Sequence, residues 1–302
     1  MAKNLISFNK YYKTFNIISI LLIAGSLFLL LFKGLNYGVD FKGGTLIELR
    51  AKDSQITISN LRQEFFKMNL GDVSVKKFGN ESDYLIKFEK KQNDNKNLIE
   101  EIKSNLTKSL GSGINFRRVE SVGPKVSSEL LKSGVIAIVL SLAAMLIYIW
   151  IRFEWQFSLG AIIAIIHDVI ITLGIFSFLS YEINLSIVAA VLTIVGYSMN
   201  DTVVIFDRVR ENLKKYTKIP ISDISNMSTH DTLSRTLITS LTTLLALFSI
   251  YFFGGEILKG FSFAMIIGVI VGTYSSIFVA TPILNYTNVS YKTISKENIE
   301  NN

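Results

Sequence analysis

Hydrophobic residues are gathered into six long stretches of this chain that contain almost no charged side chains. Each stretch is close to the ~20 residues that an α-helix needs to cross the ~30 Å hydrocarbon core of a membrane. Only two of the six contain a histidine or a charged residue, namely His167 and Asp168 in one and Asp201 in another. The pattern predicts six transmembrane helices, at residues 15–32, 133–151, 157–179, 183–206, 236–255 and 260–286.

Residues 33–132, between the first two stretches, have the pattern of a small α+β domain. Alternating apolar and polar residues predict strands at 44–50, 73–78, 84–88 and 114–122. Apolar residues at helical spacing predict amphipathic helices at 57–68 and 98–110. The order β-α-β-β-α-β is that of a ferredoxin-like, split βαβ unit. The domain has no histidine and no nucleophile–base pair, so we expect binding or positioning rather than catalysis.

Lysine and arginine are concentrated in the loops on one side of the predicted membrane helices. Because cytoplasmic loops carry this excess in membrane proteins, we expect both termini in the cytoplasm, with residues 1–14 and the polar tail 287–302 on that side. Residues 33–132 then lie on the outer side. The first apolar stretch is longer than the core of a signal peptide and no small-residue cleavage pattern follows it, so we expect a retained helix.

The overall charge and the absence of cysteine narrow the function classes. The 302 residues carry a net charge of +7, and 49% of them are hydrophobic. In so apolar a chain, the excess of basic residues is more typical of loops facing an anionic membrane surface than of nucleic-acid binding. The chain has no cysteine, which excludes disulfides, thiol nucleophiles and thiolate metal sites.

Asp201 is the most unusual residue of the apolar stretches. It lies six residues before Asp207, and therefore ~9 Å inside the cytoplasmic end of its helix. A charged aspartate at the centre of a membrane helix costs ~2.5–3.5 kcal/mol, so burial favours the neutral, protonated form. Asp201 is thus a candidate proton carrier; the alternatives are a structural hydrogen bond or a position in a water-filled mouth. It shares a helical stripe, which we expect to face other helices, with Thr193, Gly196, Tyr197, Asn200 and Val204.

Two further groups are candidates for a proton path. Arg235 precedes the helix at 236–255; it can reach the Asp201 carboxylate, or it can extend to the membrane surface instead. His167 and Asp168 lie near the middle of another helix, where they can relay protons or form a static lock between helices. A metal site is not expected, because His230 is the only other histidine and should lie in a cytoplasmic loop.

The glycine-rich stretch YGVDFKGG, at residues 37–44, is not a phosphate-binding loop. It lacks the terminal Gly-Lys-Ser/Thr of that motif, and no helix is predicted after it. We expect a tight turn that leads into a strand.

Two membrane aspartates also permit an intramembrane aspartyl protease. Against this, neither Asp168 nor Asp201 stands in the glycine-flanked signature of such proteases, and Asp168 adjoins a histidine. The competing hypothesis is a proton-coupled machine that is not an enzyme.

Several long motifs, in order along nearly the whole chain, resemble the SecF family, which belongs with SecD to the RND superfamily. They are YGVDFKGG at 37–44, VESVGPKVSSEL at 119–130, HDVIITLG at 167–174, VGYSMNDTVVIFDRVREN at 195–212, SRTLITSLTTL at 234–244 and the stretch at 253–280. The resemblance implies six transmembrane helices of RND type around the domain at 33–132, in the cytoplasmic membrane of a bacterium.

The resemblance also implies partners and a function. Members of this family pair with SecD, work with the SecYEG channel and often YajC, and assist late stages of preprotein export after the motor SecA. They use proton flow, so no cofactor other than protons is expected. Asp201 and Arg235 match the proton-path positions of the family, with Asn200, His167 and Asp168 as further candidates. A half-sized RND exporter of small molecules is the alternative; it would need a large aromatic-lined pocket in the outer domain.

Overall fold

The computed structural model describes residues 7–51, 56–70, 73–78, 80–88, 95–111 and 113–295. Within-chain contacts divide it into two compact units. The α+β unit comprises residues 37–136 together with 182–185. The helical unit comprises the chain up to Asn36, residues 137–181, and the chain from Ser186 onward.

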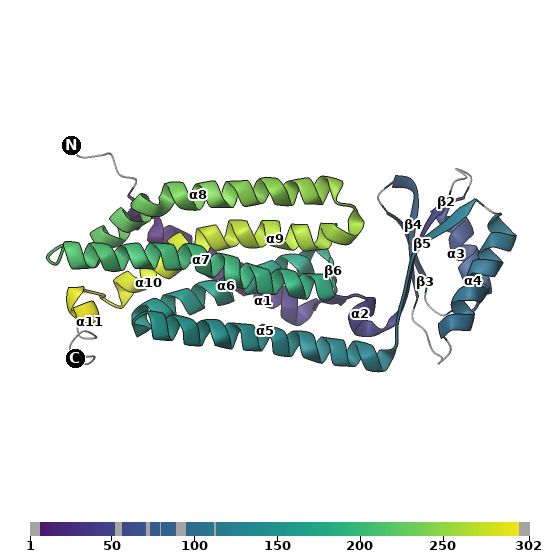
Figure 1. Cartoon of the computed structure of the whole chain (residues 1–302), viewed down its shortest axis with the longest axis horizontal. Coiled ribbons are helices and arrows are strands. Elements are labelled where there is room, and N and C mark those ends of the chain that lie inside the picture. Colours follow the sequence, from purple (N-terminus) through teal and green to yellow (C-terminus); the bar gives the residue numbers. More distant parts are fainter. Residues whose placement is uncertain are drawn as a thin grey trace. The chain divides into compact units, whose positions relative to one another are not determined.

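Six helices of the described residues are long and apolar enough to cross a membrane, as the sequence predicts. Four of them are α1 (Tyr12–Phe32), which follows the 3₁₀ turn η1 (Phe8–Tyr11), α5 (Pro124–Arg152), α6 (Trp155–Leu179) and α7 (Leu185–Lys215). The others are α8 (Ile221–Phe253) and a last span made of α9 (Glu256–Ser275), the π-helical turn η2 (Ser276–Ala280) and α10 (Thr281–Tyr286), which precedes α11 (Tyr291–Ser295). Figure 1 shows α8 and α9 as an antiparallel pair.

Helices α7 and α8 extend well beyond their predicted apolar spans. α7 continues to Lys215 and α8 begins at Ile221, so only a few residues connect them. The expectation that His230 lies in a loop is therefore wrong, because it lies on α8. The extensions were missed because they are amphipathic rather than uniformly apolar, and hydropathy alone marks only the part of a helix that suits lipid.

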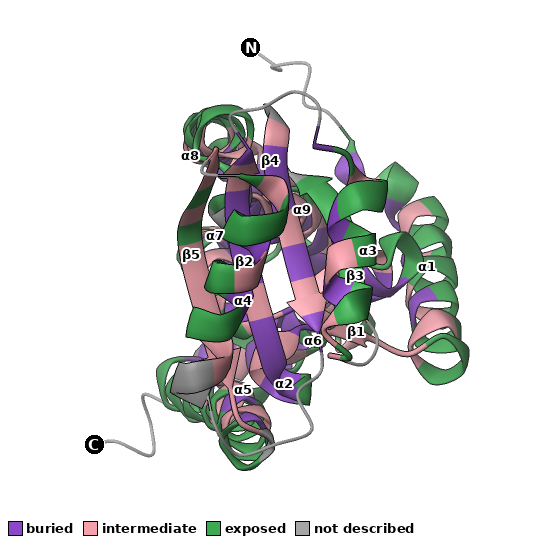
Figure 2. Cartoon of the chain, turned by 90° about the vertical axis from the view of Figure 1, so that its right-hand side faces the viewer, coloured by how far each residue is buried: buried purple, intermediate pink, exposed green. Residues whose placement is uncertain are grey.

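The interior of the helical unit is formed mainly by α6, α7 and the α9–α10 span, while α1, α5 and α8 expose most of their apolar residues. α1 exposes long apolar side chains such as Leu21 and Leu31, as a lipid-facing helix does. Figure 2 shows most of the α1 ribbon in the colour of exposed residues. The buried core at one end includes three aromatic rings, with Phe157 and Phe206 in edge-to-face contact at 5.2 Å between centroids.

Small residues allow the central helices to approach closely. A Cβ atom added to Gly268 would lie 2.3 Å from Ile194, and one added to Gly272 would lie 3.0 Å from Ser198, so α9 and α7 are in near-backbone contact. A Cβ atom on Gly174 of α6 would lie 2.3 Å from Ser26 of α1. Small residues of this kind are typical of packed interfaces between membrane helices.

The α+β unit contains a four-stranded antiparallel sheet in the order β3-β4-β2-β5. The strands are β2 (Gly44–Ala51), β3 (Val73–Phe78), β4 (Asn80–Phe88) and β5 (Ile114–Val122); the helices are α3 (Ile58–Lys67) and α4 (Asn95–Leu110). These six elements follow one another in the predicted order. The chain from residue 80 to 83, predicted as a turn, belongs to β4. Ile47 pairs with Ile86 on one side and Val119 on the other, and the first two are buried with Leu61, Phe65 and Ile102.

The glycine-rich stretch forms the entry to this sheet. β1 (Asn36–Tyr37) pairs with β6 (Glu182–Ile183), and the one-turn helix α2 (Val39–Lys42) follows. Gly43 and Gly44 then have φ angles of +80° and +132°, which side chains disfavour. The predicted turn into a strand is confirmed, whereas the helical turn within it was not predicted, because glycine-rich sequence does not favour helix.

Candidate functional site

Asp201 lies where α7, α8 and α9 meet. Its side chain is only 3% exposed, and its carboxyl group is hydrogen-bonded by the Thr273 hydroxyl of α9. The Thr273 hydroxyl lies in turn 2.7 Å from that of Ser240 on α8. The second carboxyl oxygen, Oδ2, is buried without a hydrogen-bond partner. A buried charged carboxylate with an unsatisfied oxygen is costly, so this environment suits a carboxyl group that gains and loses a proton.

Arg235 lies on α8, close enough for its charge to act on Asp201. The side chain is exposed, and among the described residues no ion pair joins the two groups. The structure therefore brings the predicted pair into electrostatic range without direct contact.

The predicted polar stripe of α7 is divided between two environments. Tyr197 faces α8, with its hydroxyl 3.5 Å from that of Thr243, and Asp201 is buried. Thr193 and Asn200 are exposed in this single chain, because α7 uses only part of its circumference to contact α6, α8 and α9. That these two residues face other helices stays a prediction.

Asp168 has a complete set of partners, in contrast to Asp201. It is 1% exposed, and its Oδ2 accepts hydrogen bonds from Ser198 of α7 and, at 2.8 Å, from Ser275 of α9. Its Oδ1 lies 2.8 Å from Nδ1 of His167. The carboxyl group thus joins three helices, which is the geometry of a static lock.

His167 is completely buried beside this lock. Its ring stacks on Tyr274 at 6.0 Å between centroids, and its Nε2 has no hydrogen-bond partner. The Tyr274 hydroxyl donates to the Phe15 carbonyl oxygen and lies 2.8 Å from the Ser19 hydroxyl, both on α1. The pair His167–Asp168 on α6 therefore contacts α7 and α9 directly, and it is connected to α1 through Tyr274.

Hydroxyl groups along the α7–α9 contact were not singled out from the sequence. Besides Ser198 and Ser275, Thr202 lies 2.8 Å from Ser276, and Thr281 donates to the Ser276 carbonyl oxygen within the π-helical turn η2. Such turns occur often at functional sites. The signal that was available is the run TYSS at residues 273–276, which places four consecutive hydroxyl-bearing side chains within a mainly apolar span.

The two aspartates do not form a protease dyad. Both oxygens of Asp168 are engaged by His167, Ser198 and Ser275, whereas Asp201 is bonded to Thr273. A dyad requires two carboxyl groups that share one proton, and here each has its own partners.

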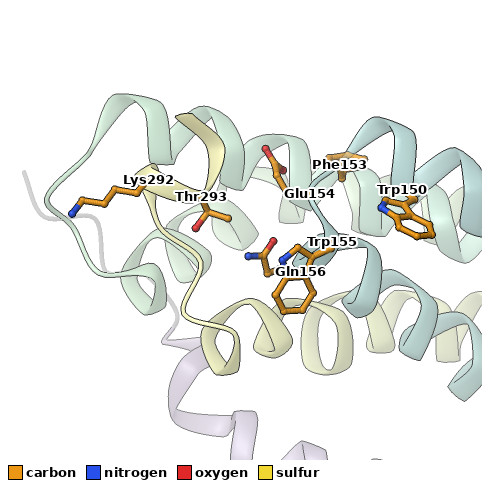
Figure 3. A pocket seen from close by; sticks show the side chains of 7 residues that line it. All are labelled: Trp150, Phe153, Glu154, Trp155, Gln156, Lys292 and Thr293. Carbon is orange, nitrogen blue, oxygen red and sulfur yellow. The ribbon is translucent and has the colours of Figure 1, made fainter. Parts of the chain in front are cut away.

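A cavity of about 530 Å³ lies elsewhere, where the turn between α5 and α6 meets α11 (Figure 3). Figure 3 shows Gln156 between Thr293 and Trp155. None of the candidate proton-path residues lines this cavity. Among the residues that the structure describes, no group of three His, Asp or Glu side chains could hold a metal ion.

The fold is that of a multi-pass membrane protein, and buried carboxyl groups lie between its helices. Comparison with known families is more specific. The family described as "Protein export membrane protein SecD/SecF, C-terminal" matches residues 102–290, and the "SecD/SecF GG Motif" matches residues 28–55. The chain belongs to the SecD/SecF family.

Similar curated proteins support the same family assignment. A protein translocase subunit SecF from Rickettsia bellii is 48% identical over 251 residues, covering 82% of each chain. SecF proteins of Vibrio alginolyticus and Cereibacter sphaeroides are 43% and 42% identical, covering 93% and 90% of this chain and 89% and 86% of their own. These relatives are named as translocase subunits.

The fold is also similar to that of a solved protein. The crystal structure of SecDF, a translocon-associated membrane protein from Thermus thermophilus, superposes with a TM-score of 0.83 at 33% identity over 95% of this chain. This chain spans only 39% of the SecDF chain.

Proposed function

We propose that this chain is the SecF-type accessory subunit of a protein translocase, which assists preprotein export by using the proton motive force. The names of the curated relatives and the likeness to SecDF support the export role. The observation that carries the proton coupling is Asp201, a buried membrane carboxyl group with one unsatisfied oxygen and a cationic side chain within electrostatic range. The chain is not an enzyme in this proposal, and protons are its only coupling ion.

The proton acts through the charge of Asp201. An ionised Asp201 is attracted to Arg235, and protonation removes that attraction. It also changes which hydrogen bonds the carboxyl group can make with Thr273, since a neutral carboxyl group can donate as well as accept. Because Thr273 and Ser240 connect α9 to α8, protonation alters the relative stability of two packings of α7, α8 and α9. One proton crossing 100 mV supplies ~2.3 kcal/mol for this change.

The topology follows from charge and helix length. Both termini lie in the cytoplasm, because lysine and arginine are concentrated at that end of the helices. Residues 33–132 form a ferredoxin-like domain in the periplasm, between the first span (15–32) and the helical region 133–286. The antiparallel order β3-β4-β2-β5 supports the ferredoxin-like assignment. The protein resides in the inner membrane as an RND-type bundle.

The main partner is a SecD-type protein. This chain corresponds to 39% of the SecDF chain, and the SecD/SecF family to which it belongs supports a SecD-type partner. The exposed polar side chains Thr193, Asn200 and Arg235 are unsuited to lipid and lie on helices that such a subunit can cover. The assembled pair acts with SecYEG and YajC on preproteins delivered by SecA, within the membrane lipid and without nucleic acid.

The groove found among the described residues of the α+β unit does not favour the small-molecule exporter. A groove of about 410 Å³ lies beside α3 and α4, and none of its lining residues is aromatic. Charged residues such as Glu64, Lys67 and Lys108 form part of its lining instead.

The test is export into membrane vesicles that contain this chain, its SecD-type partner and the channel. Asp201→Asn keeps the size and polarity of the side chain but cannot ionise. We expect it to abolish the additional export that a proton gradient provides, while ATP-driven export and assembly of the complex remain. Asn200→Asp is the complementary variant with a new ionisable group at the exposed neighbouring position. Unchanged gradient-dependent export with Asp201→Asn contradicts the proposal.

A further inference from the structure

The connection between α6 and α7 belongs, by its contacts, to the α+β unit. Residues 182–185 are grouped with that unit rather than with the helices they join. The Gly38 N–H group donates a 2.8 Å hydrogen bond to the Ile183 carbonyl oxygen, and β1 pairs with β6. Glu182 forms an ion pair with Lys87 of β4. Two separate segments of the α+β unit therefore hold this short connection.

Asp40 makes the contact that reaches α7 itself. Its Oδ2 accepts a 3.0 Å hydrogen bond from the backbone N–H of Leu185, the first residue of α7. The first N–H groups of a helix have no partners within the helix, and the positive end of the helix dipole favours a carboxylate there. Asp40 is therefore a cap for α7 that is contributed by a distant part of the sequence.

The segment that carries Asp40 is firmly attached to the sheet. Asp40 lies on α2, and Gly43 and Gly44 lead from α2 directly into β2. β2 is paired along its length with both β4 and β5. Ser127 of α5 also hydrogen-bonds the Val39 carbonyl oxygen. If the first turn of α7 moves, it would therefore displace α2 and the adjoining start of β2, an inner strand of the sheet.

The same helix carries the candidate proton site. Leu185 and Asp201 are sixteen residues apart on the uninterrupted helix α7, and therefore ~24 Å apart along its axis. Ser198 and Thr202 attach this part of α7 to α6 and to the π-helical turn η2. α7 is the element that bears both the proton-binding carboxyl group and the Asp40 contact.

We propose that Asp40 is a positioning residue that couples α7 to the α+β unit, so that movements of α7 on protonation of Asp201 are transmitted to β2. The inference rests on the proposed function. In this inference, the glycine-rich stretch attaches the start of α7 to the sheet permanently. The contact between residues 38–40 and 183–185 stays closed while α7 moves.

The structure offers a direct way to fix this contact. A Cβ atom built on Gly38 would lie 3.5 Å from the Cβ atom of Asn184, a separation that a disulfide accommodates. The φ angle of Gly38 is −77°, which a cysteine can adopt, and its Cβ atom would lie 3.3 Å from the Ile183 carbonyl oxygen, so that a shift of a few tenths of an ångström is needed. The chain has no cysteine of its own, so the double variant Gly38→Cys/Asn184→Cys forms one defined crosslink on oxidation.

The experiment compares variants of the full chain, assembled with its SecD-type partner and the channel in membrane vesicles. Asp40→Ala removes the acceptor, whereas Asp40→Asn retains an oxygen that accepts from Leu185. We expect Asp40→Ala to reduce gradient-dependent export at least several-fold, and Asp40→Asn to retain most of it. The oxidised crosslink should restore export to Asp40→Ala, and reduction should abolish the rescue. Each single cysteine variant, and the double variant under reducing conditions, controls for the substitutions themselves.

Three results would overturn the inference. They are normal gradient-dependent export by Asp40→Ala, failure of the crosslink to restore it, and loss of export when the crosslink is formed in the otherwise unaltered chain. The last result would mean that the contact has to open during the cycle. Should Asp40→Ala fail to assemble, the effect of the crosslink in the unaltered chain still decides between a closed and an opening contact.

Asp201→Asn, assayed in parallel, separates the two proposals. Gradient-dependent export that is lost with Asp201→Asn but normal with Asp40→Ala refutes only the positioning role. Gradient-dependent export that survives Asp201→Asn refutes the proton coupling itself.

Discussion

Asp168 and Asp201 are both buried carboxyl groups in membrane helices, yet their surroundings differ. Asp168 is bonded by three side chains from its own helix, α7 and α9, whereas Asp201 retains an unsatisfied oxygen. A carboxyl group whose hydrogen bonds are all satisfied gains little stability from movement. A carboxyl group with an unsatisfied acceptor oxygen can be stabilised by binding a proton or by a new hydrogen-bond partner. On this ground we propose a structural role for Asp168 and a proton-binding role for Asp201.

Replacing Asp168 should damage stability more than coupling. Asp168→Ala leaves the buried Ser198 hydroxyl without its acceptor, at a cost of about 1–3 kcal/mol, whereas the Ser275 hydroxyl can still donate to the Gly272 carbonyl oxygen at 3.1 Å. Asp168→Asn keeps an acceptor and should be milder. Thermal unfolding in detergent, followed by tryptophan fluorescence, measures the difference. Unaltered melting of Asp168→Ala together with lost gradient-dependent export would instead indicate a proton relay.

Asp83 of β4 predicts how the α+β unit responds to acid. Hydrogen bonds of 2.6 and 2.7 Å from Arg50 hold the pKa of this carboxyl group below its ordinary value. A group with a lowered pKa in the folded state stabilises the fold fully above its unfolded pKa, about 3.9, and loses that contribution as the pH falls through the folded value. Amide hydrogen exchange of β2 and β4, corrected for intrinsic rates, should therefore accelerate below about pH 4.

Asp83→Asn provides the control for this acid response. It should raise the exchange rates of β2 and β4 at neutral pH, because it removes the charge that pairs with Arg50. It should also remove the acid-dependent part of the change. An acid response that persists in Asp83→Asn would assign it to another group.

At the scale of elements, close helix contacts are set by single glycines. Gly174 of α6 has no room for a Cβ atom, since Ser26 of α1 lies 2.3 Å from that position. Gly25 of α1 has nothing within 4 Å of its Cβ position. The two glycines lie in neighbouring helices, but only one is required by packing.

Gly174→Ala should destabilise the helical unit by about 1–3 kcal/mol, because α1 and α6 must separate. Gly25→Ala should leave the stability unchanged or raise it by about 1 kcal/mol, since alanine favours helix over glycine. Thermal midpoints of the two variants in the same detergent test the difference. Equal midpoints for the two variants would show that α1 and α6 can separate to accommodate the methyl group without loss of stability.

The sequence predicted the six spans because lipid imposes one requirement, a run of about twenty apolar residues, that hydropathy measures directly. It predicted the elements of the α+β unit because strand and helix differ in the period of their apolar residues. It did not predict the serine and threonine partners of Asp168 and Asp201. Serine and threonine in a membrane helix can bond their own backbone, as Thr172 does with the Asp168 carbonyl oxygen, or reach a neighbouring helix. Which of these occurs depends on helix rotation, and spacing alone does not determine that.

At the scale of the whole molecule, the chain is one part of a larger assembly. It matches SecF proteins over most of their length but spans only 39% of SecDF. Its polar residues Thr193, Asn200 and Arg235 are exposed on α7 and α8, which also expose apolar residues such as Leu237 and Ile238. Under the proposed function, a SecD-type subunit covers these exposed residues and takes part in the proton site.

The central claim is that the Asp201 carboxyl group changes its protonation state during the cycle. Infrared difference spectroscopy of the assembled complex, recorded with and without a proton gradient, detects this directly through the C=O stretching band of a protonated carboxyl group. We predict a band that appears or disappears with the gradient, is absent in Asp201→Asn, and persists in Asp168→Asn. A carboxyl group at Asp201 that stays ionised, or stays protonated, in every state of the working complex would contradict the account.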